Sequence, residues 1–298
     1  MYPSQKLLVI GSPSGIIPDD IWSDFESHFE VRMYDFLTLE SFHDSLREGD
    51  CRDIVGILRL GLNIPADSAK VMPGWTYRGL PHFPDSLRVV VNFGHAFNDE
   101  AVDTLEARGV KFFNTTGGSE STAVVGTYLI IAAFRGLSKY ECMLRNDEFL
   151  PGLRHSAKTA VDPFGKKLGI IGMGSIGQAV ARHAAALGMQ VHCIDRSSIR
   201  RRLEQSESSE GSSHGLLPPI KLHQDLPNLV QSVDCVLLSC PLSAATHHLL
   251  RKKIFDVMKR GMRVVNISRG QCIDEEALCD AIESGVVAGV GLDVHHDE

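Results

Sequence analysis

The stretch KLGIIGMGSIGQAVARHAAALGMQVHCID, from Lys167 to Asp195, decides the fold of this chain. It begins as an apolar strand, passes through a G-x-G-x-x-G loop, and continues as a helix that Gly188 ends. A second apolar strand follows and stops at Asp195. This order of parts is typical of a βαβ unit that binds a dinucleotide, whereas three chance glycines in a tight turn would not bring the other parts with them.

The glycine loop and the first turn of the helix form the predicted phosphate site. Gly172 permits the tight turn, Gly174 lets a pyrophosphate approach the backbone, and Gly177 lets the helix pack close to the strand. Ser175 and Ile176 complete the loop, at the helix N-terminus. The N–H groups and the positive dipole end of that terminus favour phosphate binding.

Asp195 indicates which dinucleotide the site prefers. It lies eighteen positions after Gly177, where a carboxylate can accept hydrogen bonds from the adenosine ribose hydroxyls. The same carboxylate would repel a 2′-phosphate, so the sequence favours NAD. Arg196 and Ser197 are residue types that accept such a phosphate, which leaves NADP possible.

Composition and charge exclude several classes of partner. The chain has 298 residues, 43% hydrophobic residues and a net charge of −7, so it is long enough for two domains and offers no basic surface for nucleic acid or anionic lipid. Seven cysteines without C-x-x-C or zinc-ligand spacing indicate reduced thiols and no metal site. With no signal peptide and no membrane-spanning stretch in the sequence, we expect a cytoplasmic protein that does not bind membranes.

Strand and helix patterns alternate along the chain and predict the α/β class. Residues 1–117 are expected to form a flavodoxin-like substrate domain, and residues 118–298 an NAD-binding Rossmann domain. Two doubly wound parallel sheets of this kind would enclose a ligand cleft between them. Helices are expected at Pro18–Ser27, Leu249–Met258 and Val124–Phe134, the last as a link between the domains. Strands are expected at Val31–Phe36 and Val286–Val294. Residues 61–86, 147–162 and 203–219 are expected to form loops.

Three stretches that follow predicted strands of the second domain could carry chemistry: Ser239–Ser243, Asn266–Gly270 and Leu292–Glu298. Arg269 is the most informative residue among them, because a guanidinium at the end of a buried strand can bind a carboxylate through two parallel hydrogen bonds. Taken alone, an arginine on a loop could equally form a surface ion pair.

The motifs together resemble the D-isomer-specific 2-hydroxyacid dehydrogenases, including the glyoxylate and hydroxypyruvate reductases. GMGSIG with Asp195, CPLSAAT, VVNISRGQCIDEEAL and GVGLDVHHDE match that family's cofactor domain in order and spacing over residues 163–298. The resemblance implies reversible hydride transfer between NAD(P)H and a small 2-oxo acid, and a homodimer.

Carried over by position, the resemblance assigns roles to individual residues. Arg269 would bind the substrate carboxylate and keto oxygen, and Glu298 would orient the acid–base histidine, which makes both catalytic. Asp293 would hold the nicotinamide carboxamide. Cys240, Pro241 and Ser268 lie in the matching stretches and are further expected cofactor contacts.

The sequence also departs from the family pattern. The acid–base histidine of the family follows the glutamate that matches Glu298, where this sequence ends, so we expect a C-terminally incomplete domain and full activity only in a complete protein. The alternative is a catalytically impaired NAD-binding regulatory or interaction protein of the same fold. His247 and His248 are expected at a helix start, away from that role.

The substrate loop of the first domain matches the family more loosely. In the family this loop binds the substrate carboxylate through backbone N–H groups, so the resemblance places Gly94 and His95 at the substrate. Ala96 and Asn98 stand where the family has glycine and aspartate. His95 is also the candidate replacement for the missing acid.

Overall fold

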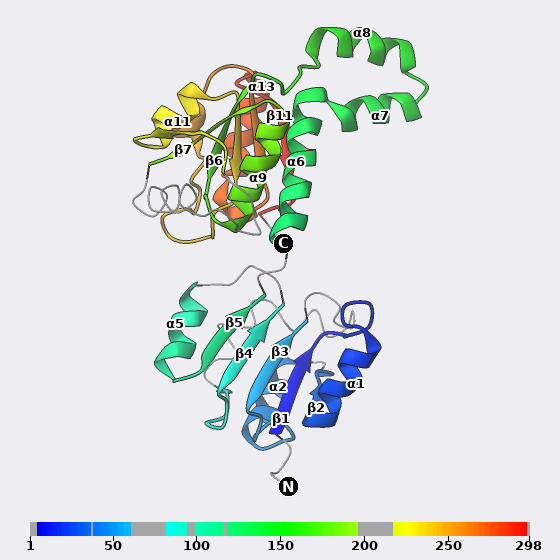
Figure 1. Ribbon diagram of the computed structural model, residues 1–298, viewed down its shortest axis with the longest axis vertical. Coiled ribbons are helices and arrows are strands. Elements are labelled where there is room, and N and C mark those ends of the chain that lie inside the picture. Colours follow the sequence, from blue (N-terminus) through cyan, green and yellow to red (C-terminus); the bar gives the residue numbers. More distant parts are fainter. Residues whose placement is uncertain are drawn as a thin grey trace. The chain divides into compact units, whose positions relative to one another are not determined.

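The computed structural model describes residues 5–36, 38–60, 82–93, 99–115, 118–195 and 217–296. The chain divides into two compact units, residues 1–118 and 119–298, which Figure 1 colours blue to green and green to red. Each unit contains one parallel sheet, which confirms the predicted class of two parallel-sheet α/β domains. The cleft expected between the domains stays a prediction.

The first unit has five strands in the order β2-β1-β3-β4-β5, all parallel. This is the flavodoxin-like order. Its described elements are β1 (Gln5–Ile10), α1 (Asp19–His28), β2 (Phe29–Met33), α2 (Leu39–Arg47), β3 (Gly56–Arg59), β4 (Val89–Asn92), α5 (Asp99–Ala107) and β5 (Lys111–Asn114). The interior strand β1 is buried over its last four residues, as expected for a strand covered on both faces.

The second unit has six strands in the order β11-β10-β9-β6-β7-β8. Numbered from β6, this is the Rossmann order, in which the direction of winding reverses between β6 and β9. Its strands are β6 (Lys167–Ile171), β7 (Gln190–Ile194), β8 (Ile220–His223), β9 (Cys235–Leu238), β10 (Met262–Asn266) and β11 (Val287–Leu292). Its helices are α6 (Ser119–Arg135), α7 (Leu137–Arg145), α8 (Phe149–Thr159), α9 (Ser175–Ala186), α11 (Leu226–Ser232), α12 (Lys252–Phe255), α13 (Glu275–Glu283) and the 3-10 turn η2 (Gly270–Cys272).

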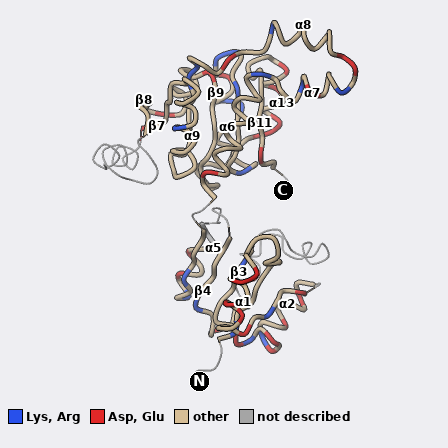
Figure 2. Tube along the Cα trace, turned by 45° about the vertical axis from the view of Figure 1, so that its right-hand side comes forward, with Lys and Arg blue, Asp and Glu red and all other residues tan. Residues whose placement is uncertain are grey.

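Separate apolar cores cover the two faces of this sheet. Residues of α6 and α9, such as Ile130 and Val180, pack on one face, and residues of α11 and α13, such as Leu229 and Leu278, pack on the other. Figure 2, which colours the backbone trace by residue type, shows acidic and basic residues interspersed along both units. The sheet is therefore buried on both sides, and its carboxyl edge is the part left for ligands.

Helix α6 belongs to the second unit and packs closely against the sheet of that unit. The sequence analysis predicted this helix as a link between the domains. A Cβ at Gly289 of β11 would overlap the carbonyl of Ala133, and one at Gly291 would lie 2.9 Å from Leu129 Cβ. In the pairing of β10 with β11, Ala288 has no partner, and Gly289 follows it opposite Arg263. This shift turns both glycines toward α6.

Several other expectations about local structure were wrong. Residues 147–162 were predicted as a loop but contain α8, whose Pro151 lies in the first turn, where a helix needs no N–H donor. The helix expected over Leu249–Met258 is shortened to α12, because Leu250 instead forms a bridge with Ile273. Strand β2 begins two residues before the expected Val31. The sequence analysis also missed β8 and α11.

Two other expectations concern segments that are largely outside the described residues, namely the loops at 61–86 and 203–219. Among the described residues, no single helix is long and apolar enough to cross a membrane. Helices α6 and α7 together pass that test by length and composition, with a bend of 67° between them.

Candidate functional site

The glycine loop after β6 has the geometry that a bound pyrophosphate requires. Gly172 has φ +104°, and a Cβ there would lie 2.6 Å from the carbonyl of Ser239. A Cβ at Gly177 would overlap the carbonyl oxygen of Gly172. By contrast, a Cβ at Gly174 would meet no described atom within 4 Å. Two glycines are therefore needed for packing, and the third faces open space where phosphate could approach.

Helix α9 begins directly at this loop with Gly174 as its N-cap, and no described side chain caps it. The first intrahelical bond runs from the N–H of Gln178 to the carbonyl of Gly174, 2.9 Å. The exposed Ser175 accepts a hydrogen bond from Ser119 Oγ at 3.0 Å, whereas Ile176 packs partly into the core. The first turn of α9 thus presents N–H groups suited to an anion.

The loop after β9 is joined to the glycine loop across the point where the sheet reverses. Ser239 Oγ donates a 2.7 Å hydrogen bond to the carbonyl of Gly172, and its N–H donates to the carbonyl of Ile171 at 2.9 Å. Cys240 is buried and Pro241 is exposed. The expected cofactor contacts on this loop therefore lie beside the glycine loop.

Asp195 lies at the end of β7, half-buried, as an adenosine-binding carboxylate requires. Its N–H donates to the carbonyl of His223 at 2.7 Å, which ties it to the neighbouring strand β8. Beneath it, His192 Nδ1 and His223 Nε2 are 2.8 Å apart and both rings are buried. Burial, with repulsion from His223, lowers the pKa of His192 to about 4. The histidine pair is therefore neutral at neutral pH.

Arg269 lies just after β10, and the buried Asn266 orders the backbone around it. Asn266 Nδ2 donates to the carbonyl of Arg269 at 2.8 Å, and Asn266 Oδ1 accepts from the N–H and the hydroxyl of Ser268 at 3.0 and 2.7 Å. The Arg269 guanidinium is half-buried and donates from Nη1 to the Ser268 carbonyl at 2.5 Å. Both ends of one buried amide thus set the direction of the loop that carries the arginine.

The segment after β11 closes on the same loop. The N–H of Asp293 donates to the carbonyl of Asn266 at 3.0 Å, and the Asp293 side chain is exposed. Gln271 Nε2 donates to the carbonyl of His296 at 2.8 Å. A Cβ at Gly270 would overlap the backbone of His295. The structure therefore brings Asp293 and Ser268 to one edge of the sheet with Arg269.

Some predicted site residues lie outside the described residues: Gly94, His95, Arg196 and Glu298. The expectation of a helix start at His247 and His248 was wrong. Both lie in a turn, His248 has φ +45°, and its N–H donates to the carbonyl of Gln271 at 2.8 Å. Their rings stack on each other with centroids 4.1 Å apart.

Sequence reasoning missed Asn266 and Ser239 as residues that order the site. Each is polar and follows or ends an otherwise apolar strand, which is the signal that could have revealed them. The partner of Ser239 could not be deduced because Gly172 lies on another loop, and the bonds of Asn266 to Ser268 and Arg269 depend on the local fold of one loop.

Comparison with known proteins identifies the family. Residues 127–298 match the family model described as D-isomer specific 2-hydroxyacid dehydrogenase, NAD binding domain. The chain is 30% identical over 278 residues to 4-methyl-2-oxopentanoate reductase A of Aspergillus oryzae, which covers 93% of this chain and 78% of that protein. The chain belongs to the D-isomer-specific 2-hydroxyacid dehydrogenases.

Solved structures agree with this membership. The holo form of Rhodotorula graminis D-mandelate dehydrogenase is similar with a TM-score of 0.84 and 31% identity, over 99% of this chain and 83% of that one. An NADPH-dependent glyoxylate/hydroxypyruvate reductase of Sinorhizobium meliloti, in complex with NADP and malonate, has a TM-score of 0.72 and 25% identity over 99% of this chain and 81% of that one. The matches span 58–78% of the length of three curated relatives.

Membership confirms the predicted class of enzyme, an NAD(P)-dependent oxidoreductase of 2-oxo and 2-hydroxy acids. The residues described above fit the cofactor, because the open space at Gly174, the N-terminus of α9 and the carboxylate of Asp195 follow one another along the carboxyl edge of the sheet. The roles of the individual residues stay predictions.

Two alanine substitutions in the glycine loop should affect different properties, one the stability of the fold and the other the binding of NADH. Gly177→Ala should lower the free energy of unfolding by about 1–3 kcal/mol, because its Cβ overlaps a backbone carbonyl. Gly174 has φ −77° and open space, so Gly174→Ala should fold normally and weaken NADH binding by about tenfold or more. Thermal unfolding and fluorescence titration with NADH measure the two effects. Unchanged NADH affinity in folded Gly174→Ala would contradict the phosphate site.

Proposed function

We propose that the protein uses NADH to reduce a small 2-oxo acid, such as glyoxylate, hydroxypyruvate or a larger homologue, to the D-2-hydroxy acid. The observation that carries this proposal is the arginine loop after β10, in which Asn266 bonds to the carbonyl of Arg269 at 2.8 Å. The glycine loop ends β6 at the same edge of the sheet. A dinucleotide along that edge would have a cation beside it to receive an anionic substrate.

The residues of this chain would bind the substrate and stabilise charge. NADH, when bound, supplies the hydride. Arg269 would bind the substrate carboxylate through parallel N–H donors and stabilise the negative charge that develops on the keto oxygen. Asp293, whose side chain is exposed beside this loop, would bind the carboxamide of the cofactor. Glu298, Gly94 and His95 would complete the site according to the family resemblance.

Replacing Arg269 should separate substrate binding from cofactor binding. We expect Arg269→Gln to lower kcat/KM for 2-oxo acids by about 10²–10³ and to leave NADH affinity within about twofold. The control is Arg251→Gln, the same substitution at an exposed arginine before α12. NADH oxidation with a panel of 2-oxo acids, and with ketones that lack the carboxylate, measures the effect.

Two outcomes would contradict the reductase proposal. One is equal reduction of ketones with and without a carboxylate. The other is tight NADH binding without turnover of any 2-oxo acid by a protein that carries the family's acid–base histidine, which would instead support the alternative of an NAD-binding regulatory or interaction protein.

We propose NAD as the preferred cofactor, with NADP as the alternative. The support is Asp195, whose carboxylate follows β7 at the position of the ribose. Arg196, beside it in the sequence, would favour the 2′-phosphate.

Substitution of Asp195 should change the cofactor preference. Asp195→Ala should weaken NADH binding by about 1–3 kcal/mol, because hydrogen bonds to a charged group are lost. NADPH binding should stay equal or become tighter, because the repulsion is removed. Titrations of both cofactors measure this, with Asp225→Ala, a helix-capping carboxylate on the neighbouring loop, as the control. Tighter binding of NADPH than NADH by the parent protein would refute the assignment.

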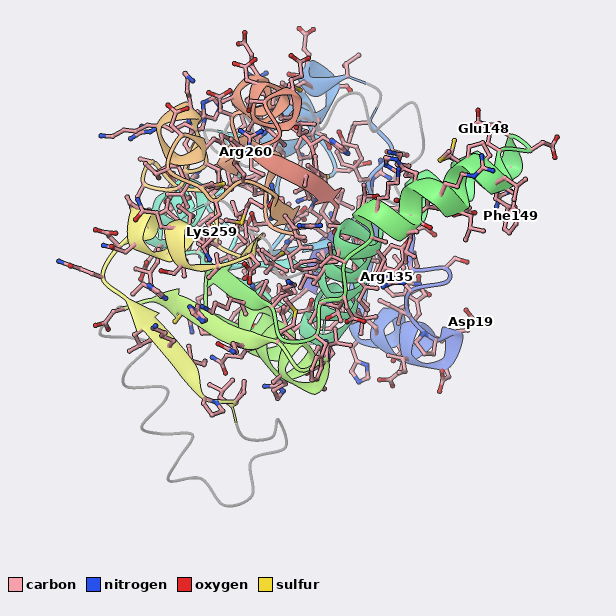
Figure 3. All side chains as sticks on the ribbon, turned by 90° about the horizontal axis from the view of Figure 1, so that it is seen from above. Asp19, Arg135, Glu148, Phe149, Lys259 and Arg260 are labelled. Atoms are coloured by element: carbon pink, nitrogen blue, oxygen red, sulfur yellow. The ribbon has the colours of Figure 1, made fainter. Side chains whose placement is uncertain are left out.

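We propose that the second unit forms a homodimer through the arm made of α7 and α8. Figures 1 and 3 show this arm extending from the body of the unit, with Glu148 and Phe149 near its tip. Its base is closed by a 2.6 Å hydrogen bond between Tyr140 and Thr159. Large apolar side chains on the arm are more than half exposed: Leu144, Phe149, Leu150 and Leu153. An exposed apolar surface of this kind is typical of a contact between copies.

A charged substitution on the arm should dissociate the dimer. Light scattering should give about twice the chain mass of 32.7 kDa for the parent. Phe149→Glu combined with Leu153→Glu should reduce it to that of one chain. The control is Ile21→Glu, on helix α1, because Ile21 is exposed to a similar extent, 57% against 59% for Phe149. A monomeric parent, or a dimer that survives the double substitution, would rule out this interface.

A further inference from the structure

Two buried cysteines, Cys240 and Cys272, lie beside the arginine loop, and neither has a role in the proposed catalysis. Cys240 is the second residue after β9 and is 8% exposed, and Cys272 ends the turn η2 and is fully buried. Both belong to the same apolar cluster on one face of the sheet. All seven cysteines are free thiols.

Hydrogen bonds fold the two segments onto each other. The N–H of Ile267 donates to the carbonyl of Leu238 at 3.1 Å, which aligns the ends of β10 and β9. Thr246 Oγ1 donates to the carbonyl of Pro241 at 2.7 Å, so the chain after Cys240 turns back. The N–H of Leu250 then donates to the carbonyl of Cys272 at 3.1 Å. Cys272 is therefore enclosed by the loop that begins at Cys240.

The sulfur of Cys272 is surrounded by donors. A hydrogen bond from Cys240 has the largest effect on the pKa of Cys272 and lowers it. Hydrogen bonds from Ser268, the Arg269 backbone and Thr246 also lower this pKa, whereas burial raises it. The resulting pKa of Cys272 is about 6. This lowering favours the thiolate of Cys272, the form that reacts with oxidants.

Another buried cysteine of the same domain has the opposite character. Burial, with the Asp195 carboxylate, raises the pKa of Cys193 to about 11. Apolar surroundings alone would therefore leave a buried thiol inert, and the donors around Cys272 make the difference.

We propose that Cys240 and Cys272 form a reversible disulfide on exposure to a peroxide, and that this bond weakens cofactor binding. The second part rests on the proposed function, in which Cys240 contacts the cofactor and Arg269 binds the substrate. Cys240 is 8% exposed and Cys272 is fully buried, so Cys240 is the more accessible of the two thiols.

The chemistry balances in two steps. The Cys272 thiolate attacks one oxygen of hydrogen peroxide, the O–O bond breaks, and a sulfenic acid forms while the hydroxide leaves as water after taking the proton of Cys240. The Cys240 thiolate then attacks the sulfenic sulfur, and hydroxide leaves and is protonated by solvent. Two thiols and one peroxide give one disulfide and two waters. Cys240 and Cys272 lie in one apolar cluster, and the disulfide requires their sulfur atoms to approach to about 2.05 Å.

The bond should disturb the site because it pulls two loops together. Cys240 follows Ser239, whose hydroxyl bonds to the carbonyl of Gly172. As a thiolate, Cys272 accepts a hydrogen bond from the backbone of Arg269. A disulfide removes the negative charge of the thiolate and so weakens this bond. Both the glycine loop and the arginine loop would therefore shift.

The test uses the full chain, reduced and then exposed to hydrogen peroxide. Peptide mapping without reductant should find Cys240 joined to Cys272, and NADH affinity should fall at least about tenfold and return with dithiothreitol. In Cys272→Ala the cross-link should be absent and peroxide should leave NADH affinity unchanged. Cys279→Ala, which removes an exposed thiol on α13, should behave like the parent protein.

Three outcomes would overturn the proposal. Oxidation confined to the exposed Cys142 and Cys279 would exclude the disulfide. A cross-link with unchanged NADH affinity would exclude its effect on the cofactor. Loss of NADH affinity by peroxide in Cys272→Ala would assign the effect to another residue. Peptide mapping does not depend on catalysis, so failure of the reductase activity can be distinguished from failure of the disulfide.

Discussion

The contact between the first turn of α9 and the carbonyl of Gly172 is the constraint on which the second domain depends. It exists only because Gly177 has no Cβ, since a methyl group there would overlap that carbonyl. The same carbonyl accepts the hydroxyl of Ser239 from the loop after β9. One backbone group therefore joins a strand, a helix and a second loop at the point where the sheet reverses direction, which is where α/β proteins bind ligands.

Buried polar groups order the rest of the site. Asn266 is 1% exposed and uses both ends of its amide on the loop that carries Arg269. A buried amide without partners would be costly, so the loop conformation that satisfies it is strongly favoured. The arginine is consequently presented by a well-defined backbone, which is what recognition of a planar carboxylate requires.

The thiol pair shows that one packing arrangement can serve stability and chemistry together. Cys240 and Cys272 fill an apolar cluster, as cysteines often do. The surrounding hydroxyl and N–H donors, however, stabilise a thiolate in that cluster. A redox response would depend on these side chains and not on the fold alone.

The sequence alone determined the βαβ unit from Lys167 to Asp195 and the class of two parallel-sheet domains, because the glycine loop, the apolar strands and the helix signals are local patterns. It also indicated that Arg269 follows an apolar strand, which the structure confirms, whereas the role of Arg269 stays a prediction. Helix α8 was missed because Pro151 and Gly152 near its start are residues typical of loops. Only the tertiary structure decided that the ends of β6, β9, β10 and β11 meet, and that Asn266 and Ser239 order the loops there. Ser239 bonds to Gly172, 67 residues away, and the N–H of Asp293 bonds to the carbonyl of Asn266. Which loops become neighbours depends on the order of strands in the sheet, which no local pattern contains.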